Sequence, residues 1–167
     1  MDGTAAMLLS TADISRCGRY RYSLTRVWNL GLPTVVFIGL NPSTADATAD
    51  DPTIRRCMGF ARAWRFGGLI VVNLFAYRAT DPRILRSVDD PIGSRNNGTI
   101  QAHCLSAQRI VAAWGIHGSL ADRAQHVLRF LHQPYCLGVT KRGSPRHPLY
   151  LAARTRLRIY PRSLTGG

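Results

Sequence analysis

The loop at residues 41–46 carries several groups that can do chemistry. The Asn41 side-chain amide both donates and accepts hydrogen bonds, so it can position a water molecule or read the edge of a nucleobase. Pro42 restricts the backbone of the loop. Ser43 and Thr44 offer hydroxyl and backbone N–H groups that can hold a phosphate or a carbonyl oxygen. This composition predicts a ligand-contacting loop, although Asn before Pro is also common in ordinary turns.

Three carboxylates follow the same loop. Asp46, Asp50 and Asp51 are candidate bases, and Asp46 is the one we expect to act in a site. One of the other two is expected to cap a helix, because an Asp directly before Pro52 is a typical helix start.

A second group of polar and aromatic residues follows an apolar run at residues 68–72. Asn73 lies where a side chain can turn into a pocket, and Arg78 can contact phosphate. Phe75 and Tyr77 can stack on a nucleobase. Core packing is the alternative role, and for Phe75 it is equally consistent with the sequence.

A third group lies in the loop Lys-Arg-Gly-Ser-Pro-Arg-His-Pro. His147 is the histidine of this chain that falls in a candidate functional loop, and it can donate a hydrogen bond to a developing negative charge. Lys141, Arg142 and Arg146 beside it are predicted to contact phosphates.

Several kinds of chemistry are not supported. The chain has no Gly-x-Ser-x-Gly elbow and no Gly-rich phosphate loop ending in Gly-Lys-Ser/Thr. Its cysteines are scattered, without a Cys-x-x-Cys pair or zinc spacing. We therefore expect no metal and no cofactor.

The charge of the chain favours a polyanionic partner. Of the 22 basic residues only Lys141 is Lys, and all nine acids are Asp, which leaves a net charge of +13. Such a chain is attracted to phosphates, and Arg also stacks on bases, so DNA is the expected partner. A generic basic surface from Arg-rich composition is the alternative. Neither a secretory signal nor a membrane span is apparent, and we expect a cytoplasmic monomer.

The pattern along the chain predicts the elements that position these loops. Alternating aromatics at 20–24 indicate a strand, whereas residues 1–15 are expected to be weakly ordered and the basic C-terminal stretch an edge strand or a tail. Buried strands are expected at 34–40, 68–74, 109–114 and 135–139, and helices at 51–66, 99–107 and 120–131. Alternating strands and helices predict a single α/β domain over residues 1–167, with ligands beyond the carboxyl ends of the strands.

Two family resemblances rest on these motifs. Leu40-Asn41-Pro42-Ser43-Thr44-Ala45-Asp46, Asn73 to Thr80 and the late His-Pro segment resemble an uncharacterised bacterial and phage domain family over most of the chain. The three loops, in the same order, are also similar to motifs of the uracil-DNA glycosylase superfamily, especially its mismatch-specific uracil/thymine branch. Together with the alternation of strands and helices, that likeness implies a three-layer α/β/α fold with a short, mainly parallel four-stranded sheet, and the alternating residues 20–24 add an N-terminal strand or hairpin.

The glycosylase resemblance implies an N-glycosidase that flips a damaged or modified base out of DNA. Asn41 would position the attacking water, and His147 would stabilise the departing base. Phe75 or Tyr77 would stack on that base, and Leu149 would fill the vacated stack. Ser43 stands where the mismatch branch has Gly, so the resemblance does not name the base.

Two other functions remain open from the sequence. One is a hydrolase of free nucleotides or nucleosides, which would act on monomers. The other is a non-catalytic nucleic-acid-binding protein, whose binding would fall steeply with salt while no bond is cleaved.

Overall fold

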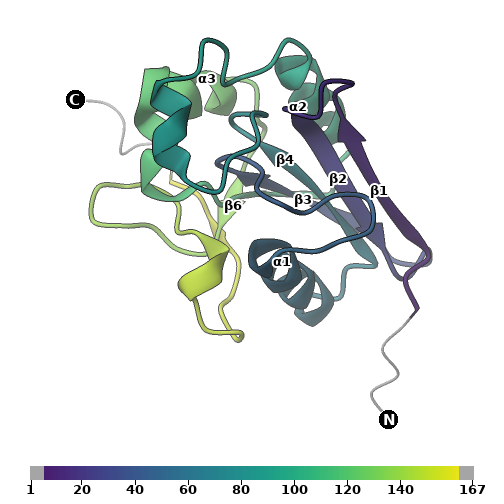
Figure 1. Cartoon of the computed structure of the whole chain (residues 1–167). Coiled ribbons are helices and arrows are strands. Elements are labelled where there is room, and N and C mark those ends of the chain that lie inside the picture. Colours follow the sequence, from purple (N-terminus) through teal and green to yellow (C-terminus); the bar gives the residue numbers. More distant parts are fainter. Residues whose placement is uncertain (1–5, 162–167) are drawn as a thin grey trace.

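The structure is a computed structural model that describes residues 6–161. In this range seven strands form one mixed sheet (Figure 1). In spatial order they are β1 (Leu9–Ile14), β2 (Arg21–Val27), β4 (Gly68–Asn73), β3 (Thr34–Gly39), β5 (Arg109–Ala112), β6 (Tyr135–Cys136) and β7 (Arg158–Ile159). The pairs β4–β3, β3–β5 and β5–β6 are parallel, whereas β1–β2, β2–β4 and β6–β7 are antiparallel.

The α/β class is confirmed, whereas the expected short, mainly parallel four-stranded sheet is not, although the four expected strands are paired in parallel. Antiparallel strands extend the sheet at both edges, which makes it wider and mixed. The expected N-terminal hairpin is present as β1 and β2, but β1 lies in residues that were expected to be weakly ordered. They pair with β2 from Leu9 opposite Val27 to Ile14 opposite Arg21, and this pairing stabilises a segment in which no side chain is fully buried. Residues 1–5 lie outside the described range.

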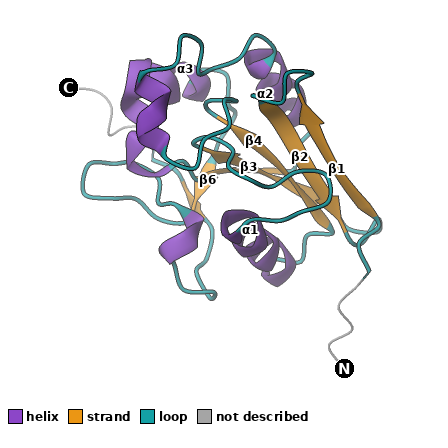
Figure 2. Ribbon diagram, viewed as in Figure 1, coloured by secondary structure: helices purple, strands orange, loops and turns teal. Residues whose placement is uncertain are grey.

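Helices cover both faces of the sheet (Figure 2). Val35 and Phe37 of β3 pack in the core under α1 (Pro52–Ala63). Val36 and Ile38 pack in the opposite core, under α2 (Asn96–Leu105) and α3 (Arg123–Leu128). Because successive side chains of a strand point to opposite faces, the continuous apolar run of β3 serves both cores.

The helices begin and end for local reasons. The Asp51 carboxylate accepts a hydrogen bond from Ile54 N at 2.9 Å, and Pro52 follows in the first turn, so α1 begins as predicted. The third helix is shorter than the expected 120–131, because Ala121 and Asp122 adopt left-handed backbone angles. Three short 3-10 helices complete the described part of the chain: η1 (Pro82–Arg86), η2 (Gly115–Asp122) and η3 (Pro148–Tyr150).

Backbone hydrogen bonds join the loops that leave the parallel strands. Leu74 N and Phe75 N donate to Gly39 O and Leu40 O, and Ala113 N donates to Ile38 O, each at 2.9 Å. The loops after β3, β4 and β5 therefore emerge side by side at one edge. Within residues 6–161 we find no helix long and apolar enough to cross a membrane.

Candidate functional site

A cavity of about 750 Å³ lies at the carboxyl ends of β3, β4 and β5. Its wall is built from the loop after β3, the first turn of α1, the start of η2 and the segment that leads into η3. A smaller depression of about 390 Å³ adjoins it, and Ser43, Thr44, Ala79 and Thr80 line both. The position is the one where open α/β sheets bind ligands, and the volume suits a small molecule.

Asn41 ties two of the cavity loops together. Its Nδ2 atom donates to Ala79 O at 2.8 Å and to Pro42 O at 3.1 Å, and Ala79 N donates to Pro42 O. Among the hydrogen bonds of the described residues, none uses Asn41 Oδ1. The amide is thus held in place by its donor end, which leaves its acceptor end for a water molecule or a ligand.

His147 enters the cavity from the loop between β6 and β7. Leu149 N donates to His147 Nδ1 at 3.2 Å, so the neutral ring carries its proton on Nε2. Burial lowers the pKa of His147, while Asp51 opposes the shift. The ring is therefore neutral at pH 7, with one N–H group to donate.

The loop that carries His147 is anchored on three sides. Gly115 N donates to Pro145 O at 3.0 Å, which ties it to the end of β5. Arg56 of α1 donates to Pro148 O, and Tyr160 Oη donates to Gly143 O. These bonds join elements far apart in the chain and fix the position of the imidazole.

The end of β4 forms the floor of the cavity. Asn73 is buried, and its Oδ1 lies 3.5 Å from Arg21 Nη2. A Cβ atom added to Gly39 would lie only 2.7 Å from Asn73 Nδ2. Gly39 therefore makes room for this amide, and any larger residue at position 39 would displace it.

Asp51, rather than Asp46, is the carboxylate of the cavity. Both Asp51 oxygens accept backbone hydrogen bonds, from Ile54 N and from Ala45 N. The Asp46 carboxylate instead accepts bonds from Thr48 N and Ala49 N, which lower its pKa, and it lines neither cavity. Asp46 thus closes its own turn, a common use of Asp in loops.

The aromatic residues after β4 separate in space. Phe75 is fully buried among α2 and α3 side chains and lines neither cavity, so it is not placed to stack on a base. Tyr77 lines the smaller depression, where it packs edge-on against Tyr20. Arg78 lines the same depression and donates to Gly18 O at 3.2 Å.

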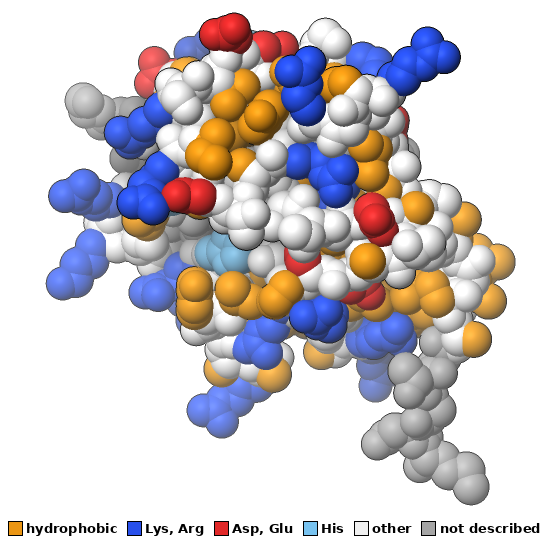
Figure 3. All heavy atoms as spheres, viewed as in Figure 1, with side chains coloured by type: hydrophobic (Ala, Val, Ile, Leu, Met, Phe, Trp, Pro, Cys, Tyr) orange, Lys and Arg blue, Asp and Glu red, His pale blue; other side chains and the backbone are white. Residues whose placement is uncertain are grey.

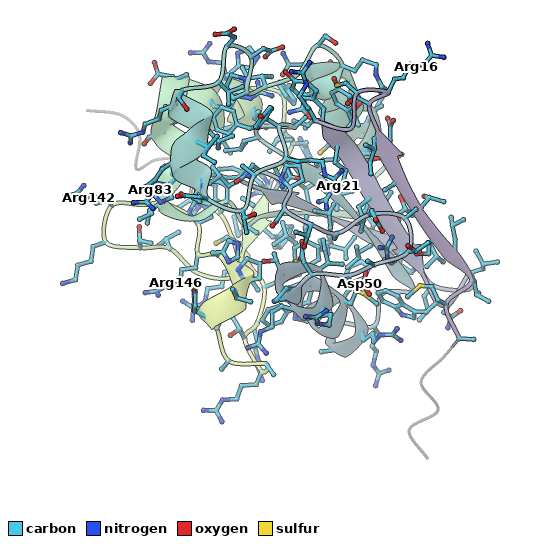
Figure 4. All side chains as sticks on the ribbon, in the orientation of Figure 1. Arg16, Arg21, Asp50, Arg83, Arg142 and Arg146 are labelled. Atoms are coloured by element: carbon cyan, nitrogen blue, oxygen red, sulfur yellow. The ribbon has the colours of Figure 1, made fainter. Side chains whose placement is uncertain are left out.

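The remaining predicted residues fall into two groups. Those that line the main cavity are Pro42, Ser43, Thr44, Arg146 and Leu149. Lys141 and Arg142 are exposed at the tip of the loop and line neither cavity, and Figure 4 shows Arg142 projecting away from the body of the molecule. Basic side chains are spread over the face shown in Figure 3, rather than gathered in one patch.

One cavity residue was missed by the sequence analysis. Arg21 was read only as part of an alternating strand, whereas Asp51 was named as a candidate base or a helix cap. The excess of Arg in the chain hides the buried guanidinium that lines the cavity, and no local pattern would have singled it out.

The described residues show no cluster of three or more His, Cys, Asp or Glu side chains suited to a metal ion. Burial raises the pKa of the Cys57 thiol, which lines the cavity, and so makes it a poor nucleophile at neutral pH. What the cavity presents is amide, imidazole, guanidinium and carboxylate groups.

The fold and the cavity define an α/β protein with a polar, cation-bearing ligand cavity at the carboxyl edge of its parallel strands. The chain belongs to the family described as "Protein of unknown function (DUF1643)", whose model matches residues 21–149. That span runs from the first residue of β2 into η3. No curated protein and no solved structure matches the chain. The match supports the expected uncharacterised domain family, while nothing in the comparisons links the chain to the uracil-DNA glycosylase superfamily.

Proposed function

We propose that this protein is an N-glycosidase of the DNA glycosylase type, with a variant of that superfamily's fold, which excises a damaged or modified base. The observation that carries the proposal is that Asn41 and His147, about a hundred residues apart, line the same cavity. Their groups are complementary, since one offers a free acceptor and the other a neutral donor.

The reaction assigns each group a task. The C1′–N bond breaks and its electron pair passes to the base. Water, oriented by Asn41 Oδ1, bonds to C1′ and releases a proton, and the base takes up a proton. His147 Nε2–H donates to an oxygen of the base as negative charge develops there, and Asp51 offsets positive charge on the sugar.

The surroundings support binding of DNA. The net charge is +13, and Arg146 lies on the wall of the cavity. The adjoining depression carries Arg19, Arg78 and Tyr77, which can hold a phosphate and stack on a neighbouring base. Tyr150 is 86% exposed and also lines the cavity, so it joins Leu149 as a candidate to fill the space left by a flipped base.

A gel assay on duplex and single-stranded DNA that contains uracil, mismatches or modified bases tests this function. Abasic sites, revealed by alkaline strand cleavage, are expected on at least one substrate. Asn41→Ala and His147→Ala should each lower the rate about 100-fold or more, the usual effect of removing one such group. Asn97→Ala and His132→Ala alter the same residue types at exposed positions and should leave the rate unchanged. Absence of abasic product on every substrate, or full activity of both site variants, would overturn the proposal.

Hydrolysis of free nucleotides is the second candidate. A cavity of about 750 Å³ with a buried guanidinium in its wall has room for a whole nucleotide. Cleavage of nucleoside monophosphates without cleavage of DNA would favour this activity.

A further inference from the structure

Arg21 is a buried cation in the wall of the cavity. It is the first residue of β2, it is only 2% exposed, and it lies between the loop after β3 and the end of β4. Figure 4 shows it in the interior, among these loops, whereas Arg16 projects outward.

The charge of Arg21 has no direct partner in the described part of the chain. Its guanidinium donates to Ala45 O at 3.0 Å and to Asn73 Oδ1 at 3.5 Å, and both are neutral oxygens. Its Nε atom is buried without a hydrogen bond, and no salt bridge within residues 6–161 includes Arg21. An unpaired charge removed from water is costly, so an arrangement of this kind favours a ligand of opposite charge.

Asp51 is not a direct partner of this charge. It lines the same cavity and acts on Arg21 through its charge, but no salt bridge within residues 6–161 joins the two, and its oxygens accept hydrogen bonds from Ala45 N and Ile54 N. Burial lowers the pKa of Arg21 to about 10, with Asp51 acting in the opposite direction and Arg78 and Arg26 adding to the shift. Arg21 therefore remains charged at neutral pH.

Other donors lie in the same wall. Ser43 and Thr44 line the cavity, and no hydrogen bond among the described residues uses their backbone N–H groups. Arg123 is a useful contrast, since it is also 2% exposed and lacks a carboxylate partner, yet it lines neither cavity. What distinguishes Arg21 is the combination of an unpaired buried charge with a place in the cavity wall.

We propose that Arg21 is the ligand-binding cation of this cavity and that it takes an anionic oxygen of the ligand. The oxygen belongs either to a nucleotide phosphate or to a base that ionises as it leaves. Hydrogen bonds between a guanidinium and an oxyanion are charge-assisted, so this pairing offsets the cost of burying Arg21. The inference rests on the cavity being the ligand site of the function proposed above.

Calorimetric titration of the full chain with two pairs of probes tests the inference. Uridine monophosphate against uridine measures the preference for a phosphate. 5-Nitrouracil, whose ring is ionised at neutral pH, against uracil measures the preference for an anionic base. The anionic member of at least one pair should bind about 10- to 100-fold more tightly, as expected for hydrogen bonds to a charged group, and that pair identifies the source of the oxygen.

Variants then assign the preference to Arg21. Arg21→Met should remove it, Arg21→Lys should retain only part of it, and Arg123→Met should leave it unchanged. Thermal melting checks that each variant is folded. If Arg21→Met does not fold, the partial loss of the preference in Arg21→Lys tests the assignment instead. The inference is overturned if the wild-type protein shows no preference in either pair, or if a folded Arg21→Met protein keeps it.

The outcome is separable from that of the proposed function, because binding is measured without bond cleavage. Asn41→Ala should keep the anionic preference while it loses any glycosidase activity. Cleavage of DNA by a protein without the preference would reject only the role of Arg21. A clear preference without cleavage of any N-glycosidic bond would reject only the proposed reaction.

Discussion

Replacement of Arg26 by methionine is expected to destabilise the protein by about 3 kcal/mol. Arg26 of β2 is 1% exposed, and its Nε donates to Asp50 Oδ1 at 3.0 Å. Its other nitrogens donate to backbone oxygens of Thr11, Thr25, Asp46 and Ala49. One guanidinium thus joins β1, β2 and the segment that leads into α1.

The magnitude follows from the burial of the two partners. Breaking a buried ion pair by removing one partner costs about 3–5 kcal/mol, because the other charge is left uncompensated. The Asp50 side chain is 28% exposed, so water can partly solvate it and the lower end of that range applies. Methionine fills a similar volume, which limits any additional cavity cost. At about 2–4 °C per kcal/mol for a chain of this size, the melting temperature should fall by about 6–12 °C.

Thermal melting monitored by circular dichroism measures this shift. Arg83→Met is the matched control, because Arg83 also pairs with an acid, Asp81, at 2.8 Å, but its side chain is 86% exposed. Exposed pairs contribute little, so the control should melt like the wild type. Arg26→Met combined with Asp50→Asn should recover part of the loss, since the uncompensated charge is then gone. An Arg26→Met protein that melts within about 2 °C of the wild type would refute the reasoning.

Three further outcomes are expected. Burial lowers the pKa of His147 in the folded state. Its contribution to stability is therefore present above the unfolded pKa of about 6.5 and is lost as the pH falls toward the folded pKa. In denaturant titrations from about pH 7.5 to 5, the free energy of unfolding should depend less on pH for His147→Gln than for the wild type. Gly39→Ala should lower stability by about 1–3 kcal/mol and weaken ligand binding, because the added Cβ would clash with Asn73 Nδ2. Gly59→Ala should instead raise stability by about 0.5–1 kcal/mol, because this position lies inside α1 with open space around the added Cβ. Cys17 should react first with a maleimide near neutral pH, because its side chain is exposed and its pKa is lowered to about 7, chiefly by a hydrogen bond with Ser15. Mass spectrometry should therefore find one label on the native chain.

Each of these outcomes has a clear contrary result. An unchanged pH dependence in the His147 variant would mean that the imidazole does not contribute to it. Equal melting temperatures for the two glycine variants would contradict the close approach of Asn73 to β3. Labelling of the native protein at Cys57 before Cys17 would contradict the burial of the former thiol.

The sequence alone determined the elements whose signals are local. The β-branched run of β3 and the Asp-Pro start of α1 predicted those elements within a few residues, because each depends on neighbouring residues in the chain. It also placed Asn41 and His147 on loops at the carboxyl ends of parallel strands, since the alternation of strands and helices predicts a common edge.

The tertiary structure decided the features that depend on distant partners. Strand β1 forms because β2 pairs with it, and Phe75 is buried because two helices cover it. Arg21 and Arg78 are the same residue type in a chain rich in Arg, yet one is buried in the cavity wall and the other lines an open depression. Burial depends on what packs over a residue, and the residue type does not encode this. The role of Arg21 in the cavity could therefore be inferred only from the tertiary structure.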